Sequence, residues 1–127
     1  MRTRTDRRGF TLIEVLVALA IVTVSLLAAL RAAGMGANNA DALRTRLLAS
    51  WVAQNALEEH RARGDWLTLG AHRRSANQAG AQFSLREEVT STPNPAFRRI
   101  DIAVYDAADE SRALARSSAV LTLAPVP

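Results

Sequence analysis

The fold of this chain is set near its N-terminus, where residues 7–14 read RRGFTLIE and an apolar run continues to Leu30. Between Phe10 and Leu30, Glu14 is the only ionisable side chain. A helix over these 21 residues would be about 31 Å long, which is enough to span the hydrocarbon core of a bilayer. We therefore predict a transmembrane helix over residues 10–30.

Basic residues precede the apolar run. Arg2, Arg4, Arg7 and Arg8, together with Asp6, give the first nine residues a net charge of +3 out of a total of +4, which leaves +1 for the rest of the chain. Because arginines are retained on the cytoplasmic side of a membrane helix, we expect a cytoplasmic N-terminus and a C-terminal part on the other side of the membrane. The small remaining charge argues against a nucleic-acid-binding surface.

Glu14 is the unusual residue of the apolar run, because a carboxylate inside a bilayer costs several kcal/mol unless it is neutralised or paired. It could be protonated, or its side chain could reach the membrane interface. It could also pair with a cation: a cut after Gly9 would give Phe10 a free α-amino group at the same end of the helix. In a bundle of parallel helices, Glu14 of one subunit would then pair with the amine of its neighbour. Gly9 suits such a cut, since a side chain there would hinder a peptidase.

The stretch from Arg8 to Glu14, with its apolar tail, resembles the class III signal of type IV pilins and type II secretion pseudopilins. The resemblance implies that a prepilin peptidase cuts between Gly9 and Phe10 and then methylates the new amine of Phe10. It also implies that Glu14 guides assembly. A secretory signal peptide is the competing interpretation, with a weak small-residue site at residues 32–34, but it leaves Glu14 unexplained.

An amphipathic segment follows the apolar run. Gly34 and Gly36, in a junction over residues 31–37, could bend or loosen the helix. From Asn38 onward, apolar residues recur near helical spacing, and they predict a packing stripe formed by Leu43, Leu47, Trp51 and Leu57. Gly64 is expected to cap the C-terminal end. One helix from about residue 10 to residue 63 would then act as both anchor and packing spine.

The period of the pattern changes from about 3.6 to 2 after a loop predicted over residues 65–80, in which Trp66, Leu67 and Leu69 would tuck against the helix. Alternation of apolar and polar residues predicts strands near 81–89, 99–104 and 120–124. The short turns between them favour an antiparallel meander. We therefore predict an α+β, pilin-like fold, in which a long N-terminal helix packs its amphipathic half on a small antiparallel β-sheet.

Two later segments resemble the I-type minor pseudopilin of type II secretion systems: residues 51–58, which read WVAQNALE, and residues 92–102, which read TPNPAFRRIDI. The resemblance implies a structural subunit without catalytic residues, cofactor or metal. It also implies that J-type and K-type minor pseudopilins are its partners at the tip of a periplasmic pseudopilus, whose assembly the complex primes. The chain would comprise a cleaved leader (1–9), a transmembrane helix (10–30), the glycine-containing junction (31–37) and a periplasmic domain (38–127).

The residues that would contact those partners are harder to assign. Ala37, Leu48 and Val52 are expected to be exposed, on the side of the helix away from Leu43 and Leu47. The alternative is that all three belong to the core.

Other functions remain open at this point. A minor type IV pilin, acting in adhesion or motility, shares the signal but often carries a disulfide, and this chain has no Cys. A membrane-anchored periplasmic binding module that keeps its N-terminus also fits the composition. His60 is expected at a solvated helix end rather than in a metal site. The acidic loop residues Asp106, Asp109 and Glu110 lack the alternating oxygen ligands of a calcium loop.

Overall fold

The computed structural model describes residues 9–123, which form one helix and four strands. The leader arginines and the last residue of the strand predicted over 120–124 lie outside the described residues. The elements are α1 (Leu12–Arg63), β1 (Gly70–Gln78), β2 (Ala81–Ser91), β3 (Phe97–Asp106) and β4 (Ala115–Thr122). The chain divides into two compact units, one ending at Ala40 and one beginning at Asp41.

Helix α1 is continuous for 52 residues and passes through Gly34 and Gly36. Its C-terminal end confirms the predicted cap. Gly64 has a positive φ of 64°, its N–H donates to the Arg61 carbonyl, and the Asp65 N–H donates to the His60 carbonyl. These two bonds form a Schellman motif, in which glycine is favoured because it has no Cβ to clash in the left-handed conformation.

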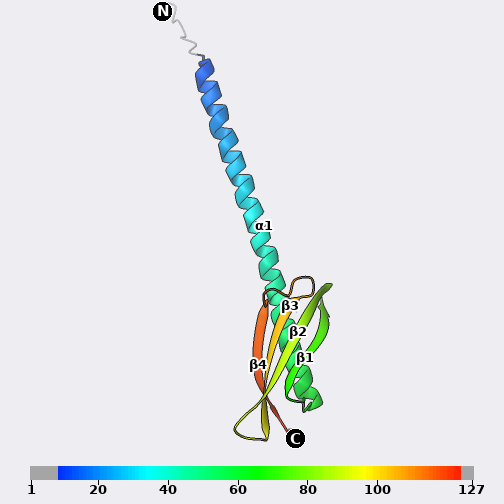
Figure 1. Ribbon diagram of the computed structural model, residues 1–127. Coiled ribbons are helices and arrows are strands. Elements are labelled where there is room, and N and C mark those ends of the chain that lie inside the picture. The colour runs from blue at the N-terminus through cyan, green and yellow to red at the C-terminus, as the bar shows by residue number, and fades with distance from the viewer. Residues whose placement is uncertain (1–8, 124–127) are drawn as a thin grey trace, which may run out of the picture. The chain divides into compact units, whose positions relative to one another are not determined.

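The sheet is an antiparallel meander with the strand order β1-β2-β3-β4. Figure 1 shows it lying along the C-terminal part of α1. The predicted α+β, pilin-like fold is therefore confirmed. Each strand puts alternate residues toward the helix, and Phe83, Leu85, Ile100, Ile102 and Val104 on β2 and β3 are almost completely buried.

The helix contributes three alanines to this core, Ala49, Ala53 and Ala56, together with Leu48, Val52 and Leu57. Since interiors are packed to crystal-like density, the side of the helix that faces the sheet need not be the side with the largest apolar residues. The predicted packing stripe is therefore wrong for three of its four members. Leu43, Leu47 and Trp51 are exposed, and only Leu57 is buried.

Strand β1 corrects the loop predicted over residues 65–80. Its sequence, GAHRRSANQ, shows little alternation of apolar and polar residues. It is an edge strand whose only sheet neighbour is β2, and its helix-facing positions are half-buried. An edge strand buries less apolar surface, so the period-2 signal is weak. In the segment before it, Leu67 packs against the core as predicted, whereas Leu69 is exposed.

Candidate functional site

The proposed processing position lies at the start of the described chain. Gly9 is exposed, and a Cβ added to it would meet no atom within 4 Å. Phe10 is 88 % exposed. Both residues precede the first residue of α1. A peptidase would therefore meet a backbone outside the helix there, not one closed by helical hydrogen bonds.

Glu14 takes part in a capping box at the N-terminus of α1. The Thr11 N–H donates to Glu14 Oε2 at 3.3 Å, and the Glu14 N–H donates to Thr11 Oγ1 at 3.3 Å. Two N–H groups that a helix leaves without partners are thereby satisfied. No role was predicted for Thr11, although the T-x-x-E spacing of positions 11 and 14 is the usual signature of this motif.

The apolar half of α1 presents side chains on all sides. Its most apolar 18-residue window has a mean hydropathy of 2.6, and none of that window is buried. An open, almost entirely apolar groove beside Glu14 is lined by Phe10, Val15, Ala18, Leu19 and Val22. Such a surface fits hydrocarbon, or the equally apolar side chains of neighbouring helices.

The three candidate partner residues do not share one environment. Leu48 and Val52 are buried against the sheet, at 6 % and 4 % exposure, so the prediction that they are exposed is wrong. Ala37 is exposed, as predicted. Leu43, Leu47 and Trp51 are spaced four residues apart on the side of the helix opposite the core, and each is at least half exposed. We call these three residues the outer stripe.

His60 is buried, at 5 % exposure, which corrects the solvated helix end predicted for it. Its Nδ1 lies 2.9 Å from Asp65 Oδ2 and its Nε2 lies 3.2 Å from Glu87 Oε2. Glu87 is itself buried and lies 3.1 Å from Arg74 Nε. The cluster thus joins the last turn of α1 to β1 and β2, and it gives the buried Glu87 carboxylate an ion pair with Arg74 and a contact with His60.

The acidic residues of the β3–β4 loop bind separate partners. Asp106 accepts the Ala108 N–H at 2.8 Å, and Asp109 accepts the Ser111 N–H at 3.0 Å. Glu110 reaches Arg86 instead, at 2.5 Å. The hydrogen bonds to Ser111 hold the pKa of Asp109 below its usual range. Within residues 9–123, no group of three His, Cys, Asp or Glu side chains is arranged to hold a metal ion.

Comparison with known proteins agrees with this geometry. The sequence profile described as "Type II secretion system (T2SS), protein I" matches residues 43–122, and that of the "Prokaryotic N-terminal methylation motif" matches residues 4–30. Three relatives carry the name type II secretion system protein I. The one from Pseudomonas aeruginosa is 36% identical over 76% of this chain and 75% of its own length. Those from Escherichia coli and Klebsiella pneumoniae are 35% and 31% identical, over 77% and 78% of this chain and 80% and 82% of their own lengths.

A methylation motif that leads into a long apolar helix, whose second half packs on a small antiparallel sheet, defines a pilin-like protein. The chain belongs to the family of type II secretion system protein I. It is therefore a minor pseudopilin, anchored in a membrane and facing the periplasm. Membership of this family implies association with other pseudopilins and processing by a prepilin peptidase, as expected from residues 8–14.

Proposed function

We propose that this minor pseudopilin joins J-type and K-type minor pseudopilins in a complex at the tip of the pseudopilus, and that this complex starts pseudopilus assembly. The observation that carries the proposal is the outer stripe. Leu43, Leu47 and Trp51 expose large apolar side chains that the chain's own sheet does not cover. Covering them with the helix of another subunit removes apolar area from water, which is the main driving force of association.

Processing would prepare the other end of the helix for assembly. We propose that a prepilin peptidase removes residues 1–9 and methylates Phe10. The chain would then be held in the inner membrane by residues 10–30, with the junction 31–37 leading into a periplasmic domain over residues 38–127. The accessible backbone of Gly9 and Phe10 supports this position for the cut.

Glu14 would then serve assembly. The new amine of Phe10 lies four residues before Glu14, so the amine of one subunit would meet the carboxylate of its neighbour when parallel helices are offset. Only Oε2 of Glu14 is used in the capping box, and Oε1 has no partner within residues 9–123. An amine that pairs with the Glu14 carboxylate would offset most of the free-energy cost of burying that carboxylate among apolar helices. The role is structural, and we assign no catalytic residue or cofactor.

The mass of the N-terminal peptide tests the processing step. The chain should be purified from membranes that contain a prepilin peptidase. We expect loss of residues 1–9 and one added methyl group on Phe10. An intact N-terminus would contradict the proposal and leave a membrane-anchored domain that does not enter a pilus-like assembly.

Copurification with the J-type and K-type partners tests the assembly step. Glu14→Ala should leave the chain inserted in the membrane but reduce the recovered complex by about ten-fold or more, because it leaves the partner's buried amine unpaired. Glu58→Ala, which removes an exposed acid elsewhere on α1, is the matched control. Leu47→Asp should also reduce recovery, whereas Leu69→Asp, at a leucine of similar exposure outside α1, should not. Full recovery of both Glu14→Ala and Leu47→Asp would overturn the proposed contacts.

A further inference from the structure

Arg31 directly follows the apolar run, on a helix that continues through it without a break. Between Glu14 and Asp41 it is the only ionisable side chain. Its side chain is exposed, and it has no hydrogen-bond or ion-pair partner within residues 9–123. A guanidinium group carries a permanent charge and five N–H donors. The partners of Arg31 therefore belong to its surroundings.

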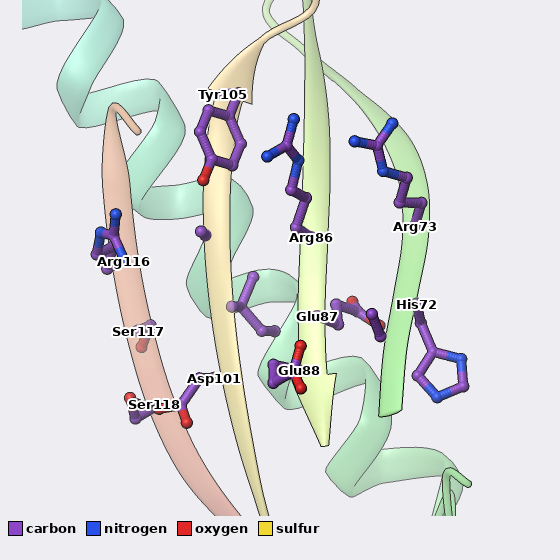
Figure 2. Close-up of a pocket in the computed structure, with 13 residues that line it drawn as sticks. His72, Arg73, Arg86, Glu87, Glu88, Asp101, Tyr105, Arg116, Ser117 and Ser118 are labelled. Atoms are coloured by element: carbon purple, nitrogen blue, oxygen red, sulfur yellow. Dashed lines mark hydrogen bonds between the residues drawn. The ribbon is translucent and has the colours of Figure 1, made fainter. Parts of the chain in front are cut away.

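Arginines on the sheet differ from Arg31 in this respect. Figure 2 shows Arg73 and Arg86 on neighbouring strands of the face that points away from α1. Glu110 places its carboxylate 2.5 Å from Arg86 and 3.6 Å from Arg73. Hydrogen bonds from Ser84 and then from Arg86 hold the pKa of Glu110 below its usual range. These two arginines are thus paired by an acid of the same chain.

The length of the apolar run places Arg31 at a membrane surface. As a helix, residues 10–30 are about 31 Å long, close to the roughly 30 Å of a bilayer's hydrocarbon core. When Phe10 lies at the cytoplasmic surface, Arg31 lies where the headgroups of the periplasmic leaflet begin. Phospholipid headgroups carry phosphate anions at this level, and arginine binds phosphate through two parallel hydrogen bonds. The surroundings of Arg31 therefore supply the ligand that its guanidinium prefers.

No other residue near this end of the run is of a type that fixes the depth of a membrane helix. Such residues are Trp, Tyr, Lys and Arg. Residues 11–43 contain none of them except Arg31. The next arginine, Arg44, is 13 residues further, about 20 Å along the helix. The depth of the periplasmic end therefore depends on Arg31.

Arg31 and Glu14 favour opposite positions of the helix. They are 17 residues apart, about 26 Å along the helix axis, which is less than the thickness of the hydrocarbon core. With Arg31 at the periplasmic phosphates, Glu14 lies about one helical turn inside the hydrocarbon. A shift toward the cytoplasm would hydrate Glu14, but it would take the Arg31 charge into hydrocarbon, which is strongly unfavourable. Arg31 thus keeps Glu14 at a depth where its carboxylate needs a partner.

We propose that Arg31 binds the phosphate groups of phospholipids in the periplasmic leaflet, and that this contact fixes the depth of α1 so that Glu14 stays within the hydrocarbon. The ligand is the phosphodiester of a lipid headgroup. The placement of Arg31 requires only the membrane anchor, whether or not residues 1–9 are removed. Its consequence for Glu14 rests on the proposed function, because a carboxylate held in hydrocarbon binds a neighbour's amine more strongly than a hydrated one does.

A thiol-accessibility assay measures the depth. The chain has no Cys, so Ala29→Cys, Ala33→Cys or Ala37→Cys, each at an exposed position, introduces a single thiol. The full chain is inserted into vesicles of phosphatidylglycerol and phosphatidylcholine and treated with a maleimide that cannot cross the membrane. Protease digestion of the sheet domain gives the fraction of chains that face outward. We expect fast reaction at residues 33 and 37 and slow reaction at residue 29, which places the membrane surface at Arg31.

Substitutions at position 31 test whether this residue sets the depth. In Arg31→Leu, the reaction at Ala33→Cys should slow by about ten-fold, because the helix is then free to move toward the cytoplasm. Arg31→Lys should stay within about two-fold of the parent, since lysine also binds phosphate. Arg44→Leu, which removes an exposed arginine further along α1, is the matched control and should have no effect. Circular dichroism verifies that each variant is folded.

Solid-state NMR identifies the ligand. An arginine labelled with ¹³C at Cζ is placed at position 31 alone, by cell-free synthesis with a suppressor tRNA. In buffer without phosphate, its dipolar coupling to lipid ³¹P should indicate a distance of about 4–5 Å, as in a guanidinium–phosphate pair. An excess of inorganic phosphate should leave this coupling unchanged. A coupling that appears only after inorganic phosphate is added would assign the site to free phosphate and overturn the lipid contact.

Three other results would overturn the proposal. Slow reaction at Ala33→Cys in the parent chain would place Arg31 below the headgroups. An unchanged rate in Arg31→Leu would show that another feature fixes the depth. A labelled Arg31 without coupling to ³¹P would exclude the phosphate contact. None of these measurements depends on removal of residues 1–9 or on copurification with other pseudopilins, so a failure of the proposed function would leave them unchanged.

Discussion

The two halves of α1 share one continuous backbone but differ in which of their side chains are buried. Up to Ala40, the apolar residues are exposed on every side of the helix and no residue of the helix is buried. From Asp41 onward, one side is buried against the sheet and the opposite side is exposed. The first half is therefore suited to a solvent as apolar as itself, and the second to a boundary between protein and water.

The apolarity of a helix therefore does not determine which of its sides is buried. In the second half, Leu43, Leu47 and Trp51 point away from the core, whereas three alanines point toward it together with Leu48, Val52 and Leu57. The side of a helix that packs is decided by the space that the facing sheet leaves. Large side chains left outside are then available for another subunit.

Two adjacent leucines give the largest expected effect. Leu48 is 6 % exposed and Leu47 is 50 % exposed. Leu48→Ala should lower the free energy of unfolding by about 3 kcal/mol, because it leaves a cavity at the helix–sheet contact. Leu47→Ala should change it by less than about 0.5 kcal/mol. Thermal unfolding of the full chain in detergent, followed through the sheet signal, measures both. Equal effects of the two changes would mean that the packed side of α1 has been assigned wrongly.

Two alanines extend the comparison to both halves of the helix. Ala53 is 1 % exposed at the sheet, whereas Ala29 is exposed in the apolar half. Ala53→Leu should destabilise the sheet domain by about 2 kcal/mol, since the core has no room for three more carbons. Ala29→Leu should leave the unfolding of the sheet unchanged in the same measurement. Tolerance of leucine at position 53 would show that the contact is looser than the burial of its residues indicates.

Acid should weaken the sheet domain that packs on the second half of α1, with the smallest effect of the three. The folded-state pKa of Glu110 is lowered, so its ionised form stabilises the folded chain above the usual carboxyl pKa. That contribution is lost as the pH falls through the lowered value. Unfolding followed from neutral to acidic pH should show this loss, and Glu110→Gln should remove its share of the acid dependence. The effect will be modest because the group is solvated. If Glu110→Gln and the parent chain show the same dependence of unfolding on pH, the ion pair of Glu110 does not stabilise the folded chain.

Much of the candidate site could be predicted from the sequence. The stretch at residues 7–14 and the apolar run are contiguous, so the residue types alone indicate a processed membrane helix, and the family profiles match them. Thr11 was accessible to the same reasoning through its spacing from Glu14. The role of His60 was not, because its partner lies on another element: Glu87 is 27 residues away from His60.

Residue order alone predicts the apolar anchor with Glu14, the glycine cap at position 64 and the antiparallel order of β2, β3 and β4. Each of these follows from neighbours in the chain, through residue spacing, backbone conformation or short connections. The folded chain is needed to show that β1 is a strand, that Leu48 rather than Leu47 faces the sheet, and that His60 is buried against Glu87. These features depend on which volumes and charges meet across elements, and packing against a partner surface is not encoded in local periodicity.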